Sequence, residues 1–134
     1  MSAVLGLDHV QVAMPAGGEE RARAFYAGVL GMAEVPKPPV LAVYGGLWFR
    51  AGAAEVHLGV EDGFRATKKA HPALRVSGLR ALLASCEAAG YETAHAEPLE
   101  DRERANVFDP FGNRLELVEI RPAAAPSTAD TAGE

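Results

Sequence analysis

Residues 109–117 read Asp-Pro-Phe-Gly-Asn-Arg-Leu-Glu-Leu, a turn followed by the beginning of a strand. Proline presets one turn dihedral and glycine accepts a positive φ, so residues 109–113 form a strong turn signal. Beyond the turn, Arg114–Ile120 predicts a strand in which Glu116 alternates with the apolar Leu115 and Leu117. This stretch therefore predicts a sheet with an apolar face and with Glu116 on the opposite face.

The closing strand has a counterpart in the first half of the chain. A shift of 59 positions aligns the two halves, and it places Gly31 on Gly90, Phe49 on Phe108 and His57 on Glu116. The opening strands align with a shift of 62, which places His9 on His71. The three-residue difference falls between the first strand and the helix, where a change of loop length costs little free energy. The alignment indicates an internal repeat of one structural unit.

Periodicity and turn residues predict the same order of elements in both halves. In the first half we expect a strand, a helix and three strands at Leu7–Ala13, Glu19–Leu30, Val40–Tyr44, Leu47–Arg50 and Glu55–Val60. In the second half the same elements are expected at His71–Val76, Leu79–Ala89, Glu92–Ala96, Arg104–Phe108 and Arg114–Ile120. Glycine at C′ ends each helix, at Gly31 and Gly90. The predicted fold class is α+β, with two tandem βαβββ modules that form a curved sheet cleft with the helices outside.

The predicted modules span residues 5–62 and 71–121, and the polar segment 63–70 connects them. Residues 122–134 are mostly Ala, Pro, Ser, Thr and Asp and include no aromatic residue, so we expect a disordered tail. Cys86 is the only cysteine, so the chain forms no internal disulfide, and we expect Cys86 to be a small core residue.

The composition predicts one globular domain of ordinary kind. The chain has 134 residues, 49% of them hydrophobic, and a formal net charge of -5. Without a basic run or a long apolar stretch, neither nucleic acid nor a membrane is an expected partner. Without a secretory signal, a cytoplasmic location is the default expectation.

Strand parity places the candidate site residues on the faces away from the helices. Repetition about a pseudo-twofold axis predicts that four of them meet at the centre, namely His9, His57, His71 and Glu116. Residues of matching parity are expected to line a substrate pocket with an aromatic wall and an anion-binding corner: Gln11, Trp48, Arg50, Arg75, Asn106 and Phe108. Two alternatives stay open, that the arginines are surface partners of Glu55 or Glu103 and that Trp48 is a core residue.

Four segments together resemble the vicinal oxygen chelate superfamily, which includes glyoxalase I, the extradiol dioxygenases, and the fosfomycin and bleomycin resistance proteins. They are Leu7-Asp8-His9-Val10, residues 25–31, His71 at the start of the second module, and residues 109–117. The resemblance implies that His9, His71 and Glu116 are metal ligands and that the protein is a homodimer. Glyoxalase I has a carboxylate or an amide at the fourth position, where this chain has His57. That histidine could ligate the metal, act as a base or face the pocket.

Two imidazoles and a carboxylate suit a divalent Zn, Ni, Fe, Mn or Co ion and leave positions for two substrate oxygens. Glu116 or His57 would be the catalytic base. We therefore expect a metal-dependent, glyoxalase-like enzyme, of lyase, isomerase or dioxygenase type, that acts on a small molecule with adjacent oxygens. The alternatives are a non-catalytic drug-binding protein of the bleomycin resistance type and a thiol transferase of the fosfomycin resistance type.

Overall fold

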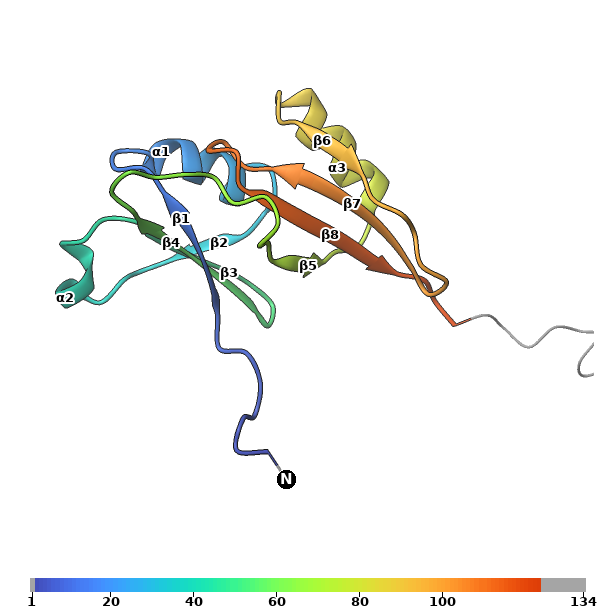
Figure 1. Cartoon of the computed structure of the whole chain (residues 1–134), viewed down its shortest axis with the longest axis horizontal. Coiled ribbons are helices and arrows are strands. Elements are labelled where there is room, and N and C mark those ends of the chain that lie inside the picture. Colours follow the sequence, from blue (N-terminus) through green and yellow to red (C-terminus); the bar gives the residue numbers. More distant parts are fainter. Residues whose placement is uncertain (1, 124–134) are drawn as a thin grey trace, which may run out of the picture.

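The computed structural model describes residues 2–123, which form two four-stranded sheets (Figure 1). The first sheet has the order β1-β4-β3-β2, with bounds Val10–Met14, Ala54–Val60, Leu47–Ala51 and Ala33–Val35. The second has the order β5-β8-β7-β6, with bounds Ala73–Arg75, Arg114–Ile120, Arg102–Phe108 and Thr93–His95. In each sheet the first two strands are parallel and the other neighbours antiparallel. The predicted α+β class and the tandem repeat are thereby confirmed.

The first predicted helix exists but changes its winding. Helix α1, Glu19–Ala22, continues directly into the π-helix η1, Arg23–Ala27. Gly31, with φ of 75°, follows this segment, as the sequence predicted for a helix end. Helix α3, Leu79–Ala88, covers the second sheet and is followed by Gly90 with φ of 92°. Each module therefore has one main helix on one side of its sheet (Figure 1).

The strand predicted at Val40–Tyr44 is wrong. Residues Pro39–Ala42 form a one-turn helix, α2, while β2 lies earlier in the chain at Ala33–Val35. The β-branched valines favoured a strand, but Pro39 at the first helical position is preset for a helix and Pro38 supplies the carbonyl that caps the turn. The edge strand β2 is only three residues long and, within residues 2–123, pairs with β3 alone.

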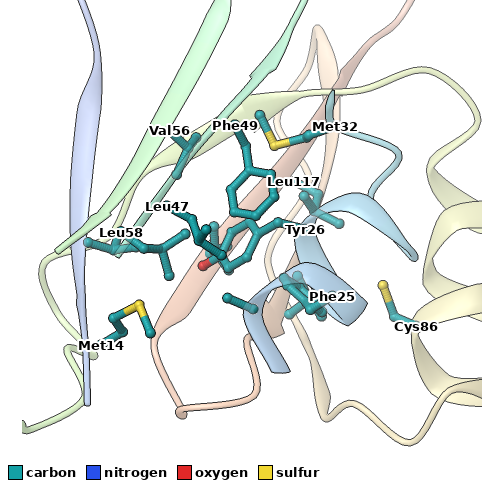
Figure 2. Close-up of a cluster of buried hydrophobic side chains, with 14 of the residues drawn as sticks. Met14, Phe25, Tyr26, Met32, Leu47, Phe49, Val56, Leu58, Cys86 and Leu117 are labelled. Atoms are coloured by element: carbon teal, nitrogen blue, oxygen red, sulfur yellow. The ribbon is translucent and has the colours of Figure 1, made fainter. Parts of the chain in front are cut away.

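A continuous hydrophobic core joins the two modules (Figure 2). Phe25 and Tyr26 of η1 are fully buried, and Tyr26 stacks on Phe49 of β3 at a ring centroid distance of 5.4 Å. Leu117 of β8 and Cys86 of α3 complete the cluster from the second module. The burial of Cys86 agrees with its predicted role in the core. Both sheets thus turn their apolar faces toward a shared core and their polar faces away from it.

The turn at residues 109–113 fastens the modules to each other. The buried carboxylate of Asp109 accepts four hydrogen bonds, two of them from backbone N–H groups of its own turn, one from the Tyr26 hydroxyl at 2.7 Å and one from the Asn113 amide. The Asn113 amide also donates to the Ala13 carbonyl at the end of β1, and its oxygen accepts from the Thr67 N–H. The turn predicted from the sequence therefore makes the hydrogen bonds that hold η1 and β1 of the first module against the second module.

The structure describes only part of the C-terminal segment for which disorder was predicted. The predicted disordered tail, residues 122–134, lies outside the described residues from residue 124 onward. Among residues 2–123, no helix has the length and apolar character needed to span a bilayer.

Candidate functional site

The polar face of the first sheet holds His9 and His57 in contact. Their rings stack with centroids 4.0 Å apart and an interplanar angle of 17°. His57 of β4 lies opposite Trp48 of β3 in register, and these rings also stack, at 4.1 Å and 6°. The result is a stack of three rings, in which His57 lies between Trp48 and His9.

His57 is the buried member of this stack. The residue is 6% exposed, and its Nε2 atom is buried without a hydrogen-bond partner in the described part of the chain. The nearest carboxylate oxygen, Glu55 Oε1, is 3.9 Å away. Burial, followed by the proximity of His9, lowers the pKa of His57, so the ring is neutral at neutral pH. A buried polar atom without a partner is rare in proteins and points to a ligand, an ion or a water at that atom.

The polar face of the second sheet holds the other pair, His71 and Glu116. Nδ1 of His71 is 2.8 Å from the Lys69 carbonyl oxygen, so Nδ1 carries the proton that this contact needs. Nε2 then faces Glu116 Oε1 at 3.0 Å. In the neutral ring both of these atoms are electron-pair donors. Contact at this distance therefore requires a proton or a metal cation at the pair.

Arg104 is a member of this cluster that the sequence analysis missed. Its Nε donates to Glu116 Oε2 at 2.7 Å, and its Nη1 donates to the Glu97 carbonyl at 2.8 Å. The hydrogen bond from Arg104 is the main cause of a lowered pKa of Glu116, and burial of the carboxylate partly opposes it. The alternation of side chains along β7 could have identified Arg104, because Arg104 lies on the same face as the predicted pocket residue Asn106. It was overlooked because the predicted strand began at Arg104 itself.

A cavity of about 640 Å³ lies against the first pair. Five of the predicted site residues line it: His9, Gln11, Trp48, Arg50 and His57. Lys37, Leu41 and Tyr44, around α2, also line it and were missed. Leu41 and Tyr44 fall in the segment that was wrongly predicted as a strand, and Lys37 lies just before it. Arg50 donates to Glu55 at 3.0 Å, which is the surface pairing that the sequence analysis left open.

The other three predicted pocket residues lie on the second sheet, outside this cavity. Asn106 is buried and accepts a hydrogen bond from Arg114 Nε at 2.9 Å. Phe108 carries the Lys68 ammonium over its ring, at 4.9 Å from the centroid. Arg75 is exposed at the end of β5.

The four predicted metal ligands therefore form two pairs within one chain and do not form a single cluster. Among the described residues, no group of three or more His, Cys, Asp or Glu side chains is close enough to hold a metal ion. The expectation that all four meet at the centre of one chain is not what this structure shows. The reason is the shared core, which draws the apolar faces of the sheets together and leaves the polar faces outward.

Comparison with solved structures finds relatives at different levels of sequence identity. A protein from Bacillus anthracis described as a member of the glyoxalase family is 44% identical, with a TM-score of 0.85, over 90% of this chain and 99% of its own. An antibiotic-binding protein, TnmS3 from Streptomyces sp. CB03234, has 18% identity and a TM-score of 0.67 over 90% and 99% of the two chains. The fosfomycin resistance protein FosX from Listeria monocytogenes has 13% identity and a TM-score of 0.67 over 94% and 98%. The last two share the fold alone. No protein-family model and no curated protein matches the chain.

Proposed function

The chain belongs to the glyoxalase family of the vicinal oxygen chelate superfamily, and from this membership we propose that it is a metal-dependent enzyme whose active site is completed by two copies of the chain. The contact between His71 Nε2 and Glu116 Oε1 carries the proposal. The Lys69 carbonyl directs the proton of His71 to Nδ1, so Nε2 and the carboxylate oxygen present two lone pairs to the same cation.

One pair of ligands is too few for a divalent ion of this kind, which takes three or four protein ligands. The second pair, His9 and His57, offers two more imidazole nitrogens, among them the unpartnered Nε2 of His57. Both pairs lie on polar faces that point away from the core. In a twofold-symmetric dimer, the first pair of each chain would face the second pair of the other chain. The dimer would therefore have two equal sites. Three imidazoles and a carboxylate suit Zn, Ni, Fe, Mn or Co.

When bound, a divalent ion would supply Lewis-acid polarisation of two adjacent substrate oxygens. The side chains around it would supply the rest. Glu116, held as a carboxylate by Arg104, can accept a proton, and the neutral His57 is the alternative base. Trp48 forms an apolar wall, and the cavity volume suits a small organic molecule.

Elemental analysis of protein purified without chelator tests the proposal. We expect about one transition-metal ion per chain, because each of two symmetric sites uses one pair of ligands from each copy. Protein that takes up no metal even after supplementation would contradict the enzyme. It would favour the second candidate, a non-catalytic drug-binding protein, which the cavity and its aromatic wall would equally serve.

A dimer is also expected in solution. Sedimentation equilibrium should give twice the chain mass of 14.1 kDa at micromolar concentration. A single species of monomer mass at these concentrations would contradict the shared site.

Mixing two inactive variants tests whether the pairs meet between chains. A chain with His9→Ala and His57→Ala lacks the first pair, and a chain with His71→Ala and Glu116→Gln lacks the second. Neither variant alone should bind metal tightly. After unfolding together and refolding in equal amounts, about a quarter of the wild-type metal content should return, because half of the dimers are mixed and each has one intact site. No recovery in a verified mixed dimer would place all ligands in one chain.

A further inference from the structure

Two arginines lie on either side of Val118, on the face of the second sheet that also carries Glu116. Arg75 of β5 and Arg104 of β7 are both in register with Val118 of β8, which lies between them. Strands in a sheet are about 4.8 Å apart, so the two arginine backbones lie roughly 10 Å from each other on the same face. Val118 is only 4% exposed and forms an apolar floor between them.

Both arginines have hydrogen-bonding capacity to spare. Arg104 uses Nε and Nη1 for Glu116 and the Glu97 carbonyl, while its Nη2 has no partner among the described residues. Arg75 is exposed and forms no ion pair with residues 2–123. The Arg75 guanidinium and the Nη2 group of Arg104 therefore remain available beside the His71–Glu116 pair.

The charge on this face differs from that of the whole chain. On the polar side of β5, β7 and β8 there is one acidic residue, Glu116, and there are four arginines: Arg75, Arg102, Arg104 and Arg114. The chain as a whole has a formal charge of -5. The acidic residues of the same strands, Glu103 and Glu119, have the opposite parity, and Glu119 accepts hydrogen bonds at the start of α3. Positive charge is thus concentrated beside the proposed metal ligands.

We propose that the substrate is an anion whose carboxylate, phosphate or phosphonate group is bound by Arg75 and Arg104. This inference rests on the proposed function, since it names the substrate class of the same site. Guanidinium groups bind such oxyanions through paired, charge-assisted hydrogen bonds. Arg104 would have two tasks, because Nε orients Glu116 while Nη2 binds the substrate. Arg75 would have a single task, which is to bind the substrate.

Calorimetry with two small probes tests the charge requirement. Pyruvate and hydroxyacetone each carry two adjacent oxygens, and only pyruvate is charged. Wild-type protein should bind pyruvate at least about tenfold more tightly, since hydrogen bonds to a charged group contribute about 1.5–3 kcal/mol. Arg75→Gln should weaken pyruvate binding by about tenfold and leave hydroxyacetone binding unchanged, and Arg104→Gln should weaken pyruvate binding by at least as much. Arg75→Gln is the cleaner variant because it does not disturb Glu116.

Arg102→Gln is the matched control, because Arg102 lies on the same face of β7 but is paired with Asp101 at 2.9 Å. It should bind pyruvate like the wild type. Equal affinity for both probes, no binding of pyruvate, or full affinity in Arg75→Gln and Arg104→Gln would each overturn the inference. Metal content measured on the same samples separates the two proposals. Wild-type protein that binds no metal would contradict the metal-dependent enzyme. Metal-loaded protein whose affinity for pyruvate is the same in the wild type and in both arginine variants would contradict only the anion site.

Discussion

Glutamine in place of Glu116 is expected to lower the metal affinity of the protein by more than about 100-fold, because loss of even an outer partner of a ligand costs 10- to 100-fold. The substitution keeps the shape of the side chain and its contact with Arg104, but it removes the negative charge that faces His71 Nε2. Competition with a chromophoric zinc chelator measures the affinity. The same loss is expected for His71→Ala, which removes the imidazole of the pair.

His95→Ala is the control for these variants. His95 is the remaining histidine, its side chain is 76% exposed, and its Nε2 lies 3.4 Å from a carboxylate oxygen of the exposed Glu97. Its removal should leave metal affinity unchanged. Wild-type affinity in Glu116→Gln, with thermal unfolding showing an intact fold, would remove Glu116 from the metal site and with it the basis of the proposed chemistry.

The second large effect concerns stability. Alanine in place of Asp109 should lower the free energy of unfolding by about 3–5 kcal/mol, as expected when a buried charged hydrogen-bond network loses its acceptor. Asp109 is 4% exposed and accepts from the Tyr26 hydroxyl, the Asn113 amide and two backbone N–H groups. Without it the Tyr26 hydroxyl stays buried and unpaired. Urea denaturation of wild type and variant measures the difference.

Two further variants refine this measurement. Tyr26→Phe removes the hydroxyl itself and should cost less than Asp109→Ala, and the double variant should cost less than the sum, since the two groups share one hydrogen bond. Asp101→Ala, at an exposed aspartate, should stay within about 0.5 kcal/mol of the wild type. A change of less than about 1 kcal/mol in Asp109→Ala would show that the turn does not hold the modules together.

The duplicated order of strands and helices, the turn at residues 109–113 and the side of each strand on which a residue lies could all be predicted from the sequence. These features depend on local rules, the alternation of side chains along a strand and the conformational preferences of proline and glycine. The prediction of Val40–Tyr44 as a strand was wrong because the same local rules favoured valine in a strand, while Pro38 and Pro39 set a helical turn.

Tertiary structure alone decided which faces meet. Parity placed His9, His57, His71 and Glu116 on polar faces, but whether two polar faces oppose each other within one chain depends on how the sheets pack. That packing is set by long-range burial of Phe25, Tyr26 and Leu117, which no local pattern encodes. The alignment of Arg75 and Arg104 across Val118 is likewise a matter of strand register, which becomes fixed only when β5 and β7 pair with β8.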